Sequence, residues 1–339
     1  MMFQDRVFII AEAGVNHNGS LETARALVDV ASQAGADAVK FQTFTAARIA
    51  SRGAEMADYQ KRYSGDSGSQ YEMLKRLELD ESDHHALAAY CTKKEILFLS
   101  SPFDEQAVDL LLQVGVPLLK VGSGEITNLP LLSYIGSKGL PVILSTGMSM
   151  LGEVERAVAV LSGQCCPDIA LLHCVTEYPA PVEQVNLNAM LTLRQAFALP
   201  VGYSDHTIGF EIPVAAAALG ARILEKHFTL DKSMPGPDHA ASLDPTELAL
   251  MVRAVRNVEQ ALGDGIKRPA PCELSNRDVA RKSLIAARAL AAGETLRRED
   301  IAVKRPGSGI APEYLQRVVG RVVKTDVGAD EVLRWEQLS

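Results

Sequence analysis

The sequence predicts a closed parallel (β/α)8 barrel, the TIM-barrel fold, followed by a small and mostly β domain. Three observations support this prediction. Short apolar runs alternate eight times with longer segments of helical periodicity before residue 262. The runs are almost continuously apolar, as strands covered by helices on both faces are. Polar residues gather where the runs end, which is where the active sites of such barrels lie.

The predicted strands are short and often β-branched. They cover Phe8–Glu12, Ala38–Gln42, Leu97–Pro102, Leu118–Gly122, Pro141–Thr146, Ile169–Cys174, Pro200–Asp205 and Ile223–Phe228. Helices are predicted where apolar residues recur at i, i+3 and i+4, for example in Ser20–Ala34, Leu151–Leu161 and Pro245–Leu262. Eight such units in residues 1–262 fit a closed barrel better than an open doubly wound sheet.

Two segments depart from this alternation. Residues 43–70 form a connection that is too long for an ordinary loop, so we expect a lid or a dimer contact there. Residues 263–275 begin with a run rich in Gly and Pro and are expected to form a flexible linker. Residues 276–339 hold the short β-like runs of the predicted second domain, namely Ser283–Ala287, Gly293–Leu296, Ile301–Gly307 and Val318–Val323.

Composition limits the class of protein. Of the 339 residues, 47% are apolar and 22% are charged, which is typical of a globular chain. The formal charge of -8 argues against a nucleic-acid partner held on a broad basic face, although a local phosphate site is compatible with it. Residues 276–339 carry 12 basic and 9 acidic side chains, so a barrel of charge -11 precedes a domain of charge +3.

No apolar run approaches the roughly 20 residues that span a bilayer. The beginning of the chain contains only the short apolar run Val7–Ala11, so we expect no signal peptide, no membrane partner and a cytoplasmic protein. The cysteines lack both CxxC spacing and the density of a disulfide scaffold, so free thiols are expected at Cys91, Cys165, Cys166, Cys174 and Cys272. Cys174 is interpreted as a small buried core residue.

Two imidazoles lie at the ends of neighbouring predicted strands. His206 follows the seventh strand and His227 lies near the end of the eighth. Such a pair can share one divalent ion and leave coordination positions open for water and substrate. Outside a barrel, two hydrogen-bonded histidines at a loop edge would be the better interpretation.

Two lysines, Lys40 and Lys120, close otherwise apolar strands. A lysine at this position reaches solvent, forms a Schiff base or pairs with an anion, and two lysines facing one mouth favour the anion. The small residues of Gly122–Glu125 and Ser145–Ser149 offer backbone N–H groups that suit a phosphate or carboxylate. Such Ser/Gly tracts are also ordinary turn chemistry.

A carboxylate, Glu12, ends the first predicted strand. It is costly to bury unless it is paired or used, so it is a candidate for orienting a substrate or a lysine. The alternative is a salt bridge to Lys40 across the barrel. The following tract His17–Ser20 is compatible with a simple turn and a helix N-cap.

Seven ordered motifs together resemble the sialic acid synthase family. They are Ile10–Gly19, Val39–Thr43, Leu119–Glu125, Leu144–Met148, Tyr203–Thr207, Glu225–Thr229 and Pro235–His239. In addition, Val303–Gly309 resembles the antifreeze-like (SAF) domain of that family, so the resemblance covers nearly the whole chain.

The resemblance implies an enzyme that condenses phosphoenolpyruvate with an N-acylated hexosamine. The product would be a nine-carbon 2-keto acid, with phosphate released by C–O cleavage. N-acetylmannosamine is the expected acceptor, and the alternative is a 2,4-diacetamido-trideoxy hexose, the acceptor of an N,N'-diacetyllegionaminate synthase. Two interpretations from other classes stay open: an aldolase or isomerase with a Schiff base on Lys40 or Lys120, and a non-catalytic binding protein.

The same resemblance implies roles for single residues. His206 and His227 would hold a divalent metal, manganese or otherwise magnesium or cobalt, and would act in catalysis together with Glu12 and Glu125. The expected phosphoenolpyruvate-binding residues are Lys40, Lys120, Ser123, Ser145, Thr146 and Ser204. The expected sugar-binding residues are Glu12, Gln42, Thr176, Tyr178, Asp238 and Arg305.

The resemblance also implies a domain-swapped homodimer, in which Arg305 reaches the sugar in the barrel of the partner subunit. Two positions depart from part of the family. Thr176 stands where some members have an asparagine, and Arg281 stands where some carry an aromatic residue. Both bear on which sugar is accepted rather than on the type of reaction.

Overall fold

The computed structural model describes residues 6–63 and 68–339 and divides into two compact units. The first is Met1–Gly263 and the second is Asp264–Ser339, so the division lies beside the end of the predicted barrel.

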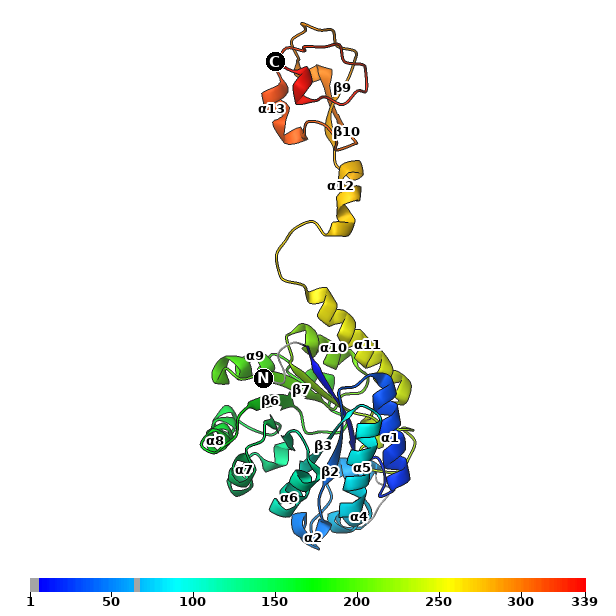
Figure 1. Ribbon diagram of the computed structural model, residues 1–339, viewed down its shortest axis with the longest axis vertical. Coiled ribbons are helices and arrows are strands. Elements are labelled where there is room, and N and C mark those ends of the chain that lie inside the picture. Colours follow the sequence, from blue (N-terminus) through cyan, green and yellow to red (C-terminus); the bar gives the residue numbers. More distant parts are fainter. Residues whose placement is uncertain (1–5, 64–67) are drawn as a thin grey trace. The chain divides into compact units, whose positions relative to one another are not determined.

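The first unit is the predicted TIM barrel (Figure 1). Its strands are β1 (Phe8–Gly14), β2 (Ala38–Thr43), β3 (Leu97–Pro102), β4 (Leu119–Val121), β5 (Val142–Ser145), β6 (Ile169–Cys174), β7 (Val201–Asp205) and β8 (Ile223–His227). Every hydrogen-bonded pair is parallel, and the strand order is β3-β2-β1-β8-β7-β6-β5-β4. The terminal strands β3 and β4 pack against each other and complete the ring, without a ladder between their described residues.

Helices follow the strands and cover the outside of the barrel (Figure 1). They are α1 (Leu21–Ala34), α5 (Glu81–Lys93), α6 (Glu105–Val114), α7 (Leu129–Gly136), α8 (Leu151–Ser162), α9 (Ala189–Phe197), α10 (Glu211–Ala218) and α11 (Pro245–Leu262). Helix α1 begins where the Ser20 hydroxyl accepts a hydrogen bond from the Thr23 N–H, and it ends at Gly35, whose φ is 79°. The helices predicted at α1, α8 and α11 are confirmed.

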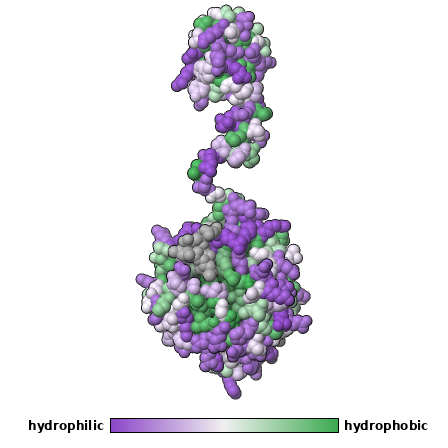
Figure 2. All heavy atoms as spheres, in the orientation of Figure 1, coloured by the Kyte–Doolittle hydropathy of each residue, from purple (hydrophilic) through white to green (hydrophobic). Residues whose placement is uncertain are grey.

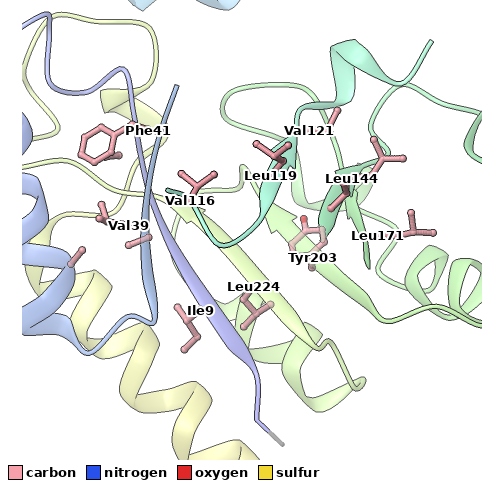
Figure 3. Close-up of a cluster of buried hydrophobic side chains, with 14 of the residues drawn as sticks. Ile9, Val39, Phe41, Val116, Leu119, Val121, Leu144, Leu171, Tyr203 and Leu224 are labelled. Carbon is pink, nitrogen blue, oxygen red and sulfur yellow. The ribbon is translucent and has the colours of Figure 1, made fainter. Parts of the chain in front are cut away.

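The strands have two faces with different partners. Figure 3 shows residues of one face, including Ile9, Val39 and Leu224, in the cluster that packs beneath the helices. The alternate residues form a second cluster made of residues from the strands and their immediate starts: Phe8, Ile10, Ala38, Leu99, Leu118, Ile143, Ala170, Leu172 and Ile223. Because side chains alternate along a strand, this second face lines the barrel interior.

The long connection after β2 is partly helical. It contains α2 (Ala46–Ile49) and α3 (Asp58–Tyr63), and α4 (Gln70–Arg76) begins at its end. Phe44 and Met56 are buried in a small cluster with Val15 and Met73. This cluster lies against the loop that follows β1. A role as a lid or dimer contact stays a prediction, and residues 64–67 lie outside the described residues.

The second unit holds the antiparallel pair β9 (Ser283–Ala286) and β10 (Ile301–Lys304). It also contains α12 (Leu274–Ala280) and α13 (Leu315–Val318), so part of the expected linker is helical and the predicted β-like run at Val318–Val323 begins inside a helix. Only single bridges, such as Thr295 with Val322, extend the strand pairing there. One-turn 3-10 helices occur in both units at Ser123–Glu125 (η1), Val182–Gln184, His239–Ala241, Pro271–Glu273, Arg298–Asp300, Pro312–Tyr314 and Trp335–Gln337.

The visible surface of both units is mainly hydrophilic, with a group of hydrophobic residues near the middle of the barrel face (Figure 2). Within residues 6–63 and 68–339, no helix has the length and apolarity needed to cross a membrane.

Candidate active site

A cavity of about 220 Å³ opens at the carboxyl ends of the strands. It is lined by Lys40, Gln42, Ser101, Phe103, Lys120, Gly122, Ser123, Gly124, Ser145, Cys174, Thr176, Tyr178, Ser204, His206, Glu225 and His227. Most of the sequence-predicted binding residues are therefore brought together at this mouth.

Strand alternation explains this assembly. On most strands the last apolar residue of the interior face is followed two positions later by a polar side chain, for example Ile143 by Ser145 and Ile223 by Glu225. The apolar layer fills the middle of the barrel, and the polar layer above it forms the floor of the cavity. The fold thus places polar groups that would be costly inside the core at the point where substrate can use them.

Lys40 pairs with two carboxylates. Its Nζ lies 2.7 Å from Glu12 Oε2 and 3.7 Å from Glu225 Oε2, and it donates to Ser101 Oγ at 3.0 Å. Glu12 and Lys40 are register partners on neighbouring strands. The expected salt bridge of Glu12 therefore exists, but it joins adjacent strands instead of crossing the barrel.

Lys120 approaches the same carboxylate from the other side. Its Nζ donates to Ser145 Oγ at 2.7 Å and lies 3.5 Å from Glu225 Oε1. The Ser204 hydroxyl donates to that oxygen at 2.9 Å. Glu225 is thus the centre of a buried network that holds both lysines in place.

Burial and the neighbouring lysines shift the pKa values of Glu12 and Glu225 in opposite directions. Burial raises the pKa of Glu225, but Lys120, Lys40 and the Ser204 hydrogen bond outweigh it and bring the pKa to about 2. Burial raises the pKa of Glu12 to about 7, because Lys40 opposes burial there only in part. Glu225 is therefore a fixed anion, whereas Glu12 can gain or lose a proton near neutral pH.

The two lysines also differ. Burial lowers the pKa of Lys40, but Glu12 and Glu225 outweigh it and raise that pKa above its ordinary value. Burial lowers the pKa of Lys120 below its ordinary value. When both lysines are protonated and Glu12 is neutral, the cavity carries excess positive charge, which suits a small anion.

The two imidazoles lie together at the cavity wall. The ring centroids of His206 and His227 are 5.5 Å apart, and the Tyr178 ring lies 4.1 Å from that of His206. His206 Nδ1 donates to the Val175 carbonyl at 2.6 Å, which leaves Nε2 as its basic nitrogen. His227 Nδ1 is buried without a hydrogen-bond partner, 3.8 Å from Asp238 Oδ2.

These residues fit a divalent cation. Burial lowers the pKa of His206 to about 4, and burial, His206 and Lys40 lower that of His227 well below its ordinary value. Both rings are thus neutral at pH 7, as metal ligands must be. No group of three or more His, Cys, Asp or Glu side chains suited to a metal occurs among the described residues. His206 and His227 would therefore be the two protein ligands of an ion whose other coordination positions stay open.

Five predicted site residues do not line the cavity alongside the others. Glu12 is buried next to Lys40, with which it forms an ion pair. The Thr146 hydroxyl faces away and donates to the Leu172 carbonyl at 3.0 Å. Glu125, in η1, accepts from Asn128 Nδ2 at 2.7 Å. Asp238 lies behind His227. Arg305 belongs to the second unit, where its Nε donates to the Ala280 carbonyl at 3.1 Å.

Sequence reasoning did not select Ser101, Phe103, Cys174 or Glu225 as site residues. Glu225 is the most consequential of these, since it binds both lysines. The signal that was available is the alternation along each strand, which places Glu225 on the same face as His227.

Residues 27–267 match the model of the NeuB family, and residues 281–339 match that of the SAF domain. The chain belongs to the NeuB family. It is 48% identical over 335 residues to the N,N'-diacetyllegionaminic acid synthase of Legionella pneumophila, covering 98% of this chain and 94% of that protein. It is 47% identical to the enzyme of the same name from Campylobacter jejuni, covering 97% and 99%.

A solved NeuB relative has the same fold. The structure is that of the N-acetylneuraminic acid (sialic acid) synthetase of Leptospira borgpetersenii in complex with citrate. Its TM-score is 0.71 at 37% identity, covering 80% of this chain and 90% of that one.

Proposed function

We propose that this NeuB-family chain condenses phosphoenolpyruvate with an N-acylated hexosamine to form a nine-carbon 2-keto acid and phosphate. The observation that carries the proposal is the cavity in which two lysines, four serine hydroxyls and two neutral imidazoles meet. This set supplies an anion site beside a metal site. The names of the relatives at 48% and 47% identity support the same class of reaction.

Phosphoenolpyruvate carries a phosphate and a carboxylate, and the cavity offers matching groups for both. Lys40 and Lys120 supply charge, and the hydroxyls of Ser123 and Ser145 supply directed hydrogen bonds. Thr146 and Ser204 stay weaker candidates, because their hydroxyls already donate to the Leu172 carbonyl and to the Glu225 carboxylate.

His206 and His227 would hold the divalent metal, for which manganese is proposed and magnesium or cobalt are alternatives. When bound, such an ion polarises the aldehyde oxygen of the acceptor and stabilises negative charge that develops there. Glu12 is better placed than Glu125 to exchange a proton with substrate. Its pKa of about 7 lies near the working pH, and it pairs with Lys40, which lines the cavity.

The acceptor site is proposed from Glu12, Gln42, Thr176, Tyr178 and Asp238. Of the two candidate sugars, the 2,4-diacetamido-trideoxy hexose is favoured over N-acetylmannosamine. The relatives at 48% and 47% identity are named as N,N'-diacetyllegionaminic acid synthases, which supports this choice.

A homodimer is proposed in which Arg305 of the partner subunit completes the sugar site. The linker between the units and the opposite signs of their charges support this arrangement. Because phosphoenolpyruvate is a cytoplasmic metabolite, we place the reaction in the cytoplasm.

Phosphate release is the direct test. The protein is incubated with phosphoenolpyruvate, manganese and either N-acetylmannosamine, its 6-phosphate or the diacetamido sugar, and phosphate and keto acid are measured. We expect turnover with the diacetamido sugar to exceed that with the other two. No phosphate with any acceptor would contradict the proposal.

One observation favours a second class of reaction. The lowered pKa of Lys120 is what a Schiff-base lysine requires. Borohydride treatment in the presence of substrate distinguishes the Schiff-base mechanism from the proposed condensation, since only a Schiff base leaves a covalent adduct on the lysine. A trapped adduct on Lys120 would replace the proposed condensation by an aldolase mechanism.

A further inference from the structure

Ser123 has a crowded hydroxyl group. It lies at the start of η1, directly after β4, and lines the cavity. Its Oγ accepts a hydrogen bond from the Gly147 N–H at 2.9 Å, and Cys174 Sγ lies 3.1 Å away. These contacts come from the ends of β5 and β6, so three neighbouring strands converge on one oxygen.

The direction of these hydrogen bonds can be worked out. A serine hydroxyl has one proton and two acceptor positions, and the Gly147 N–H occupies one of them. Burial raises the pKa of Cys174, so its sulfur carries a proton. Sulfur is a weak acceptor and a hydroxyl oxygen a good one, which favours donation from the thiol to Ser123 Oγ. With both acceptor positions filled, the Ser123 proton is directed to the cavity.

Close packing keeps the three groups in this arrangement. A Cβ atom on Gly147 would lie 2.8 Å from Ser123 Oγ, 3.0 Å from Cys174 Sγ and 2.4 Å from Thr176 Oγ1. A side chain at that position would displace these groups, so the observed approach of the backbone N–H to Ser123 depends on the residue being glycine. Cys174 is itself 5% exposed and lies on the interior face of β6.

We propose that Cys174 is a positioning residue, whose thiol fixes Ser123 as an obligate hydrogen-bond donor toward the bound phosphoenolpyruvate anion. This inference rests on the proposed function. It assigns to Cys174 a role that its burial and its protonated thiol do not reveal. No covalent chemistry of the sulfur is involved.

The test is a comparison of four variants: Cys174→Ala, Cys174→Ser, Ser123→Ala and the double variant Ser123→Ala with Cys174→Ala. Steady-state kinetics give kcat and the KM of each substrate, and calorimetry gives the Kd of phosphoenolpyruvate. Cys174→Ala should raise KM and Kd for phosphoenolpyruvate about five- to tenfold, as expected for one hydrogen bond of about 1 kcal/mol. It should change kcat and the KM of the sugar less than about twofold.

Cys174→Ser retains a donor and should stay within about twofold of the unmodified protein. Because Cys174 acts through Ser123, removing it in the Ser123→Ala background should have no further effect. Cys91→Ala is the matched control, since Cys91 is an equally buried free thiol on α5, away from the cavity. It should leave both KM values unchanged.

The outcomes distinguish the positioning role of Cys174 from the proposed role of Ser123 in binding phosphoenolpyruvate. Additive effects of Cys174→Ala and Ser123→Ala, or equal impairment in Cys174→Ser and Cys174→Ala, would overturn the positioning role alone. An unchanged Kd for phosphoenolpyruvate in Ser123→Ala would overturn it together with the proposed role of Ser123. If Cys174→Ala does not fold, Cys174→Val provides a second variant without a donor and should show the same rise in Kd.

Discussion

Asp205 and Lys226 form an ion pair that is completely enclosed in the barrel. Lys226 Nζ lies 2.6 Å from Asp205 Oδ2, and neither side chain has exposed surface. Lys226 also donates to the Thr207 carbonyl, while Asp205 accepts from the N–H and hydroxyl of Thr207. The pair therefore fixes the turn that contains His206, although both side chains point away from the cavity.

Lys226→Met should destabilise the barrel strongly. The change leaves Asp205 buried without its counter-charge, so the free energy of unfolding should fall by about 3–5 kcal/mol. Urea unfolding followed by circular dichroism measures this loss. Lys75→Met is the control, since the pair of Lys75 with Glu78 lies on the surface and should contribute little to stability. A similar small loss for Lys226→Met would show that the enclosed pair contributes little.

Metal binding should depend on both imidazoles of the cavity and not on a third histidine nearby. His206→Ala and His227→Ala should each abolish manganese binding in calorimetry and metal-dependent turnover. His173→Ala is the matched control, because His173 lies on the other face of β6 and bonds to the Val185 carbonyl at 2.7 Å. Full metal binding by His227→Ala after chelator treatment would contradict the assignment.

The barrel was predictable from sequence because its strands are continuously apolar and its helices amphipathic. The parts of the fold that sequence reasoning missed lack such periodicity. Helix α12 has no buried residue, so no apolar stripe marks it. The short helix α2 is held by a few buried contacts, since its Ile49 packs against Phe44 and Met56 in a cluster that forms only when the chain is folded.

The site was predictable to the extent that strand ends carry polar residues. Which of them face the cavity depends on strand alternation. Thr146, Asp205 and Lys226 lie on the helix-facing side of their strands, and Ser145, Ser204 and Glu225 lie on the other. The central role of Glu225 was not visible in sequence, because it depends on two lysines from distant strands meeting one carboxylate.

Stability should rise with pH between about 4 and 6.5 because of His17. Its side chain is fully buried, and burial together with the nearby His84 and His239 lowers its pKa from 6.5 to about 4. In this window the unfolded chain binds the additional proton, so the folded state is favoured as pH increases. This difference in pKa between the unfolded and folded states corresponds to roughly 3 kcal/mol in the free energy of unfolding. That stability is lost as the pH falls from 6.5 to 4.

Urea unfolding at several pH values tests the His17 contribution. His17→Asn keeps an acceptor for the Gly19 N–H, which now bonds to His17 Nδ1 at 3.0 Å, but it cannot be protonated. Its stability should therefore depend less steeply on pH than that of the unmodified protein. His85→Asn, at an exposed position on α5, is the matched control and should keep the original slope. Equal slopes in all three proteins would exclude His17 as the cause.

Arg305 should matter for the sugar and not for phosphoenolpyruvate. It follows β10 in the second unit, is exposed, and lies next to Lys304, which pairs with Asp330. Loss of a charge-assisted hydrogen bond should raise the KM of the sugar about 10- to 100-fold in Arg305→Ala, with the KM of phosphoenolpyruvate unchanged. Lys304→Met removes the neighbouring charge and should leave both values near those of the unmodified protein.

Subunit complementation shows whether Arg305 acts across the proposed dimer. Arg305→Ala and His206→Ala are each expected to be impaired alone, but a mixed dimer would contain one barrel with intact imidazoles facing an intact Arg305. In an equal mixture half of the dimers are mixed, and each has one complete site, so about a quarter of full activity should return. Co-expression with two different affinity tags isolates the mixed species. If the activity of the mixed dimer does not exceed the mean activity of the two parent variants, Arg305 either acts within its own subunit or does not contact the sugar.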